Sequence, residues 1–452
     1  MSDRHSQGLY NSLSIIYNVL QLKPGFNACR RRQARFPHTQ RINAPQFVHF
    51  AKKHNRLTTG TGEGGLAEAQ EAGMARCRER LNRLLELSRE AAEQHGMAAA
   101  EFDRKVEKLN SEFRTYWNEQ QPNLRLADAE PDVILTAIYE FMNPITPEEQ
   151  TVALLRPRIG KVGYNSFIIS ICDADNREEM ERGFLHYALG ERRIICVTGT
   201  AVFLTLALKH GVEVYPARVK IDISGRVFGQ DGMWGHVCAG YQKGDGQVRL
   251  IDITKRLPDA RHRRFELITE NPECYLVASA WINRGFVLGK LGCYEDALSS
   301  NDRAIELAPE YADAWMGIGF VLGKLGCYED AFESYDRAIE LAPEYTDAWV
   351  NRGLVLEELG RNEDALKSYD RAIELAPENA AAWIDRGFVL EELGRNEDAL
   401  KSCDRAIKLA PENEDAWVIR GIVLYKLGRN EEALASHDKA EELERTSNHP
   451  QA

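Results

Sequence analysis

The sequence predicts an α+β unit that is preceded by helices and followed by an all-α solenoid of repeated helix pairs. Two observations carry this prediction. Over residues 278–447 a tryptophan recurs every 34 residues, which is typical of stacked helical repeats. Upstream, a helix that is apolar nearly all round (196–208) precedes segments of alternating apolarity, the pattern of a buried helix packed on an antiparallel sheet.

Composition limits the class of protein. The chain has 452 residues, of which 44% are hydrophobic and 28% charged, so a wholly disordered chain is excluded. Nine cysteines without a secretory signal are typical of reduced thiols, so we expect a cytoplasmic protein. No stretch approaches the roughly 18 apolar residues of a membrane span, so we expect no membrane partner.

Charge is distributed unevenly along the chain. The net charge is −12, yet residues 1–60 sum to +9 and residues 278–447 to −16. Only the 1–60 arm has the charge to bind nucleic acid, and no nucleic-acid partner is expected elsewhere. Residues 1–65 are expected to form a basic, disordered arm, with an arginine-rich targeting peptide or a nucleic-acid arm as alternatives. The glycine-rich run 60–65 lacks the Lys-Ser/Thr of a phosphate loop and is interpreted as a linker.

Helices are expected next along the chain. Residues 66–125 carry leucines at helical spacing and are interrupted at His95-Gly96, which predicts a helical hairpin. The unit 126–270 then begins with two short helices (131–143 and 147–155), each opened by a proline. The helix 196–208 stops at Gly211, and strands are expected over 212–223, 235–241 and 247–253.

Three residues of the α+β unit form a candidate catalytic group: Cys196, His236 and Asp252. Cys196 opens a helix, where free backbone N–H groups and the helix dipole favour a thiolate. The imidazole of His236, at the start of a strand, could accept the thiol proton. Asp252 ends the next strand, so an antiparallel hairpin would place its carboxylate beside that imidazole. The pattern indicates nucleophilic catalysis by a Cys-His-Asp triad.

These residues resemble the pattern of the transglutaminase-like superfamily, and the resemblance covers residues 155–265. In that pattern a cysteine opens a buried helix that ends at a glycine, here Cys196 and Gly211. A strand that holds Ala217-Arg218-Val219, a strand that begins at His236 and the end Asp252-Ile253-Thr254 follow in family order. Three positions depart from the pattern and separate this chain from the animal crosslinking enzymes: Ile194, the triplet His236-Val237-Cys238, and Ile253.

The resemblance implies an α+β transglutaminase-like (papain-like) catalytic domain over 126–270 that transfers acyl groups from protein amide bonds. Peptidase or glutamine-deamidase activity is expected in preference to crosslinking. No cofactor and no metal are expected, because no histidine or cysteine cluster has zinc spacing. Asn165 or Tyr164 could complete the oxyanion site, and Cys172 is the competing nucleophile, in a strand-like setting without a helix terminus. The alternative is a catalytically silent scaffold whose only function is protein–protein interaction.

The 34-residue period covers five unbroken units over 278–447. Glycine, alanine and proline recur in register with the tryptophans, which are Trp281, Trp315, Trp349, Trp383 and Trp417. This pattern resembles the tetratricopeptide repeat, with two short helices in each unit. A glycine in the first helix, such as Gly353, would let a side chain of the second helix approach closely.

The two ends of the repeat array differ from its middle. In the last unit Glu441 replaces the isoleucine of the earlier units, which is expected where no further unit covers this position and it faces water. Residues 448–452 are expected to form a tail. The first helix carries Trp281 and Ile282 and lacks a polar cap, so it should pack on the preceding domain. The connection 267–275 is expected to be a short linker.

The repeats are expected to bind a protein or peptide in their groove by apolar contact. In the family that they resemble, specific positions of the first helices line this groove, and here those positions hold Ile282, Phe286, Met316, Phe320, Val350, Leu354, Ile384 and Phe388. Further along units three and four lie Glu357, Glu358, Glu391 and Glu392. These acids favour a partner with an apolar face and a basic stretch. The alternative is that the chain's own helices over 66–120, or its basic arm, fill the groove.

Overall fold

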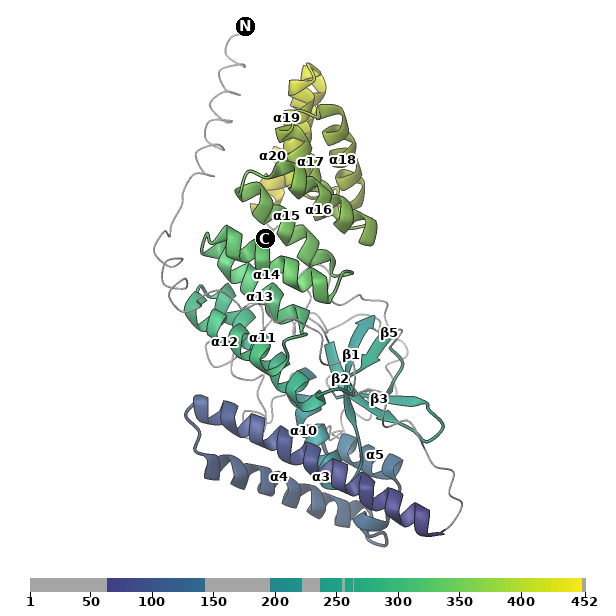
Figure 1. Cartoon of the computed structure of the whole chain (residues 1–452). Coiled ribbons are helices and arrows are strands. Elements are labelled where there is room, and N and C mark those ends of the chain that lie inside the picture. Colours follow the sequence, from purple (N-terminus) through teal and green to yellow (C-terminus); the bar gives the residue numbers. More distant parts are fainter. Residues whose placement is uncertain (1–62, 143–195, 222–235, 254–256, 263, 449–452) are drawn as a thin grey trace.

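The computed structural model describes residues 63–142, 196–221, 236–253, 257–262 and 264–448, drawn as ribbon in Figure 1. Residues 1–62 of the predicted basic arm and the predicted helix 147–155 lie outside these residues, whereas residues 63–65, predicted to end the arm and its linker, begin a helix instead. A hairpin of two long helices comes first, α3 (Glu63–Gln94) and α4 (Ala99–Gln120). Gly96, in the turn between them, has a φ of 82°, which glycine adopts without strain. The hairpin occupies residues for which the sequence predicts one.

Three further helices precede the sheet in the described residues. A short 3-10 helix, η1 (Leu126–Asp128), leads to α5 (Pro131–Met142), whose proline suits a first helical turn. The helix α10 (Cys196–Lys209) is buried on several sides, through Phe203, Leu204, Leu206 and Leu208. Its apolar sequence therefore reflects a core position, as predicted.

The sheet has five antiparallel strands in the described residues, in the order β4-β3-β2-β1-β5. Their bounds are β1 (Tyr215–Ile221), β2 (His236–Gln242), β3 (Val248–Asp252), β4 (Leu257–Ala260) and β5 (Arg264–Leu267). The first three lie where the sequence predicts strands. The other two were not predicted, because each is only four residues long and too short for a clear alternation.

The core lies between α10 and one face of the sheet. Val237 and Ala239 of β2 and Ile251 of β3 are buried in one cluster with Phe203 of α10. The opposite face of the sheet holds a separate small cluster that includes Val219 and Cys238. Alternate residues of β2 thus enter different clusters, as the two-residue period of a strand requires. The layers form an α+β unit.

The repeats form a solenoid of ten helices within residues 272–448 (Figure 1). Each pair of consecutive helices is one unit. The bounds are α11 (Pro272–Lys290), α12 (Tyr294–Leu307), α13 (Ala312–Lys324), α14 (Tyr328–Leu341), α15 (Thr346–Glu358), α16 (Asn362–Leu375), α17 (Ala380–Glu392), α18 (Asn396–Leu409), α19 (Glu414–Lys426) and α20 (Asn430–Asn448). The predicted all-α solenoid is confirmed.

Close approach of glycine to an aromatic ring holds the two helices of a unit together. A Cβ atom on Gly353 would lie 2.5 Å from Cε1 of Tyr369, and one on Gly319 would lie 2.7 Å from Cε1 of Tyr335. The predicted role of Gly353 is confirmed. At the far end of the array Glu441 is exposed, which agrees with its predicted position on a surface that faces water.

The first repeat packs against the helical hairpin and α10. Trp281 and Ile282 are buried in the same cluster as Leu84 of α3 and Phe203 of α10. The imidazole of His95 stacks on Trp281 with ring centroids 5.5 Å apart. The predicted packing of unit one on the preceding part of the chain is therefore confirmed.

The predicted linker 267–275 is corrected by the structure. Leu267 ends β5 and Pro272 begins α11, so only residues 268–271 separate the sheet from the repeats. Asn271 has a φ of 45°, a left-handed conformation that asparagine tolerates better than most residues. The first helix of unit one is longer than predicted, because it begins at Pro272 rather than near residue 278.

Candidate functional site

The site lies where the start of β2, the end of β3 and the start of α10 meet. Ala239 of β2 pairs with Ile251 of β3, and the antiparallel register then brings His236 and Asp252 to the same end of the two strands. Thr200, one turn into α10, donates a hydrogen bond to the Cys196 carbonyl at 2.7 Å and lies 3.3 Å from the Val237 carbonyl. This hydroxyl holds the start of α10, and thus Cys196, close to the start of β2.

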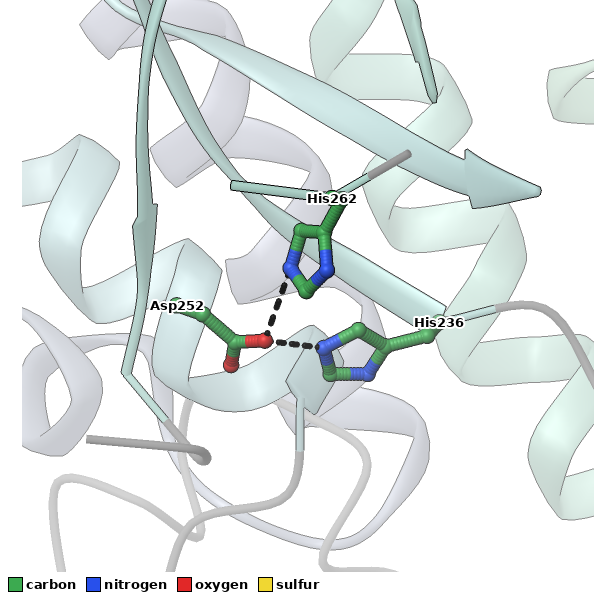
Figure 2. A group of neighbouring side chains, drawn as sticks. All are labelled: His236, Asp252 and His262. Atoms are coloured by element: carbon green, nitrogen blue, oxygen red, sulfur yellow. Dashed lines mark hydrogen bonds and ion pairs between the residues drawn. The ribbon is translucent and has the colours of Figure 1, made fainter. Parts of the chain in front are cut away.

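His236 and Asp252 are hydrogen-bonded and buried (Figure 2). Nε2 of His236 lies 2.6 Å from Oδ2 of Asp252, and the two residues expose 7% and 0% of their surface. Burial by itself lowers the pKa of His236, but the hydrogen bonds to Asp252 and Cys196 outweigh it and raise the pKa to about 9. The imidazole is therefore held in its protonated form at neutral pH.

Cys196 is the first residue of α10 and is partly buried. Burial by itself raises the pKa of the thiol, but hydrogen bonds from His236 and from the Val237 backbone N–H leave the pKa below its ordinary value. Since Nε2 of His236 faces Asp252, Nδ1 is the ring nitrogen left for the sulfur. The structure thus brings the three predicted residues together, with the imidazole of His236 between the sulfur of Cys196 and the carboxylate of Asp252.

The other residues predicted for this site cannot be placed. Asn165, Tyr164 and Cys172 lie outside the described residues. The oxyanion role of the first two, and the role of Cys172 as competing nucleophile, therefore stay predictions.

His262 belongs to the site and was not predicted. It lies between β4 and β5, is 6% exposed, and its Nε2 is 3.2 Å from the same Oδ2 atom of Asp252 (Figure 2). The resemblance assigns no role to this position, and the strands on either side are too short to predict. The signal available in the sequence was a histidine ten residues after Asp252, in the same unit.

The structure divides the predicted apolar groove residues into two groups. Leu354 on α15 and Phe388 on α17 expose 41% and 37% of their surface. Phe286, Phe320 and Val350 are partly exposed. The assignment of three others to the groove is corrected, because they are buried in the cores between helices and offer no surface to a partner: Ile282, Met316 and Ile384.

The predicted acidic residues also divide. Glu358 and Glu392 are exposed, one helical turn after Leu354 and Phe388. Glu391 is buried, and its carboxylate forms an ion pair with Lys426. Its assignment as a free groove acid is therefore corrected.

Glu357 is partly buried in the same region. It accepts a hydrogen bond from the hydroxyl of Tyr369. Burial is the largest influence on the pKa of Glu357 and raises it, whereas the hydrogen bond from Tyr369 lowers it. The nearby carboxyl groups of Asp385, Glu358 and Glu392 raise the pKa further, and the net result is a pKa of about 8. Burial, followed by the charge of Asp415, likewise raises the pKa of Asp385 to about 7. Units three to five thus crowd carboxyl groups around α15 and α17.

Comparison with known proteins defines the class of the C-terminal part. A model of the tetratricopeptide repeat matches residues 287–346, 321–380, 350–414 and 384–450. The C-terminal part of the chain therefore consists of tetratricopeptide repeats. A model described as anaphase-promoting complex subunit 5 matches residues 257–316, across β4, β5 and the first repeat. No curated protein matches the chain.

Several solved structures resemble the repeats. MamA is 21% identical over 36% of this chain and 96% of its own, with a TM-score of 0.34. MamA from Desulfovibrio magneticus RS-1 is 22% identical over 37% of this chain and 96% of its own, with a TM-score of 0.35. YrrB, described as a TPR protein with an unusual peptide-binding site, is 28% identical over 37% of this chain and 86% of its own, with a TM-score of 0.33.

The family models support one of the two predicted functions, protein–protein interaction and acyl transfer, better than the other. They support a protein-interaction function better than an enzyme, because the matched residues of both family models lie within 257–450. None of them supports the transglutaminase-like resemblance. No helix in the described part of the chain is both long and apolar enough to cross a membrane.

Proposed function

We propose that the chain binds a protein segment on the surface formed by Leu354, Glu358, Phe388 and Glu392, here called the groove patch. Leu354 and Phe388 occupy the same position of consecutive first helices, 34 residues apart, and Glu358 and Glu392 follow one turn later. The helices that carry them, α15 and α17, contact each other. The observation that supports the proposal most is that two large apolar side chains are exposed at equivalent positions of two first helices that contact each other.

The chemistry of the groove patch defines its partner. Apolar side chains favour an apolar face on the partner, and the exposed carboxylates of Glu358 and Glu392 favour lysine or arginine one turn away. The net charge of −16 over residues 278–447 acts in the same direction. Because Leu354 and Phe388 are exposed, the helices over 66–120 do not cover the groove patch, whereas at unit one Ile282 is buried in the same cluster as Leu84 of α3.

The proposal is tested by peptide binding to the full chain. A fluorescent amphipathic peptide of leucine and lysine is titrated against wild type and against the double variant Leu354→Ala/Phe388→Ala. The double variant should bind about tenfold more weakly or worse, since each apolar side chain buried on binding contributes roughly 1.5 kcal/mol. Leu434→Ala, at another exposed leucine on α20, is the matched control and should bind like wild type. Equal binding by wild type and the double variant would rule out the groove patch.

A second function is supported by the geometry at Cys196. We propose that Cys196, His236 and Asp252 catalyse acyl transfer from protein amide bonds. The thiolate would attack the amide carbonyl carbon, and the C–N bond would break as His236 gives its proton to the leaving amine. The resulting thioester would be hydrolysed by water that His236 deprotonates, which restores the thiol. Asp252 would hold the imidazole in place through both steps. Hydrolysis would make the enzyme a peptidase or a glutamine deamidase.

Labelling by a thiol-directed electrophile tests this second function. Full-length protein is treated with iodoacetamide at low excess and at neutral pH, and the labelled cysteines are identified by peptide mass spectrometry. Cys196 should react before Cys293, an exposed thiol outside the site. His236→Gln should abolish the preference, while His437→Gln in α20 should not. If Cys293 reacted before Cys196 in wild type, the acyl-transfer proposal would be wrong and the interaction function alone would stand.

A further inference from the structure

Two imidazole rings meet at one buried carboxylate oxygen. Nε2 of His236 is 2.6 Å and Nε2 of His262 is 3.2 Å from Oδ2 of Asp252. The two rings are nearly perpendicular, with an interplanar angle of 79°, and Figure 2 shows both edges directed at the same oxygen. One ligand atom from each of the three residues lies within 4.8 Å of the others. A thiol nucleophile requires only one imidazole, so the triad does not explain His262.

The three groups match the ligands of a borderline divalent cation. Two imidazole nitrogens and one carboxylate oxygen, with a fourth position left open, are a common donor set for zinc. At bond lengths near 2.0–2.1 Å, two ligands of a tetrahedral ion lie about 3.3 Å apart. The distance from His262 to Asp252 is already 3.2 Å. The distance from His236 to Asp252 must open by roughly 0.7 Å, a movement within reach of a side-chain rotation.

The free nitrogen of His262 leaves its ring able to bind a metal. Nδ1 of His262 is buried and has no hydrogen-bond partner in the described part of the chain. No second hydrogen bond therefore fixes the tautomer, and Nε2 can present either a proton or a lone pair toward Asp252. For His236 the side chain of Cys196 hydrogen-bonds the ring and would hold it in place while Nε2 binds the ion.

We infer that His236, Asp252 and His262 bind a divalent cation of the zinc class, in competition with the thiolate–imidazolium pair. A lone pair on Nε2 of His236 takes either a proton or a metal ion, so a bound ion excludes the imidazolium. With the ion on Nε2 and a proton on Nδ1, the ring has no lone pair left to accept the proton of Cys196, so the thiol loses its base and becomes a poor nucleophile. The inhibitory consequence rests on the proposed acyl-transfer function, whereas the binding of the ion does not.

Binding of zinc to the full chain in a Cys196→Ala background tests the site without its thiol. Titration calorimetry with zinc chloride should give one ion per chain with micromolar affinity or tighter. Adding His262→Gln should weaken binding at least tenfold, while adding His437→Gln, the matched control, should leave the affinity unchanged. Absence of binding, or equal affinity in the His262→Gln variant, would overturn the inference.

X-ray absorption on the zinc-loaded Cys196→Ala and wild-type proteins keeps the inference testable if His262→Gln fails to fold. Both spectra should show nitrogen and oxygen ligands only. A sulfur ligand in wild type, or calorimetric binding that is lost in Cys196→Ala, would place the ion on the thiol and overturn the proposed ligand set.

Iodoacetamide labelling of the wild type separates failure of this inference from failure of the enzyme proposal. Labelling of Cys196 should slow at least tenfold with zinc and recover with a chelator. If the Cys196→Ala protein binds zinc but Cys196 of metal-free wild type is unreactive, the metal site stands and the acyl-transfer proposal fails. If zinc binds and labelling is unchanged, the competition between metal and thiolate is wrong.

Discussion

Nη2 of Arg218 on β1 donates a hydrogen bond to Oδ2 of Asp313 on α13 at 2.7 Å, and this ion pair ties the second repeat to the sheet. Asp313 also accepts a hydrogen bond from the hydroxyl of Tyr345, the residue just before α15, at 2.9 Å. Val219, the next residue after Arg218, pairs with His236 across β1 and β2. The repeats are therefore fixed to the strand beside the candidate catalytic histidine, which gives a bound protein segment a constant position relative to Cys196.

Removal of Asp313 should destabilise the chain strongly. Asp313→Ala leaves the guanidinium of Arg218 partly buried without its carboxylate, and the unfolding free energy should fall by about 3 kcal/mol. Asp347→Ala is the matched control at the equivalent position of the next repeat, where the side chain is partly exposed, and it should cost about 1 kcal/mol or less. Urea unfolding of the two full-length variants measures the difference. An equal loss of unfolding free energy in the two variants would mean that the ion pair of Arg218 with Asp313 does not stabilise the contact between the sheet and the repeats.

The close packing of Gly353 on Tyr369 gives a second prediction. A methyl group at Gly353 would lie 2.5 Å from the ring, so Gly353→Ala should cost about 1–3 kcal/mol. At Gly421 the nearest atom to an added Cβ is the Ala433 carbonyl oxygen, at 3.4 Å. Gly421→Ala should therefore be within about 1 kcal/mol of wild type, since alanine favours the helix. Thermal unfolding compares the two, and a larger loss for Gly421→Ala would contradict the packing account.

Glu357 predicts how the stability of the repeats depends on pH. Its pKa is about 8 in the folded protein and near 4.5 in an unfolded chain, so between these values the folded state binds more protons. The stability of units three and four should therefore fall as pH rises from about 5 to 8. Glu357→Gln keeps an acceptor for the Tyr369 hydroxyl but cannot titrate, so the loss of stability between pH 5 and 8 should be smaller in this variant. Titration of Asp385 should account for part of the remaining pH dependence.

Hydrogen exchange of the amide groups in α15 and α16, measured at pH 5.5 and 8, tests this dependence after correction for the intrinsic exchange rates. Glu363→Gln, at an acid in the first turn of α16, is the control and should leave the dependence as in wild type. If the stability of α15 and α16 in wild type rose between pH 5.5 and 8, the expected effect of Glu357 would be wrong.

The triad could be predicted from the sequence because each residue lies at the end of a regular element with a local pattern. Cys196 begins an apolar helix, His236 begins a strand, and Asp252 ends the next one. Antiparallel pairing of consecutive strands then brings the two strand residues together. His262 could not be predicted in this way, because it reaches the site from the short segment between β4 and β5.

The solenoid was equally predictable, but the exposure of individual groove positions was not. A strict 34-residue period determines the helix pairs, but it does not show which positions of a helix its neighbours cover. Packing between neighbouring helices decides which of the two predicted groove positions stays exposed. Met316 is 8% exposed, whereas Leu354, at the other predicted groove position one unit later, is 41% exposed. The ion pair of Glu391 with Lys426 likewise depends on a residue of the following unit.

The central claim is that the groove patch recognises an apolar, basic protein segment, and reversal of its charge tests this most directly. The affinities of a leucine–lysine peptide and of a leucine–glutamate peptide are measured for the full-length wild type and for Glu358→Lys/Glu392→Lys. Both glutamates are exposed, so the double variant should fold like wild type. Wild type should prefer the basic peptide by about tenfold or more, and the double variant should prefer the acidic one. The same preference in both proteins, or no binding of either peptide, would contradict the account.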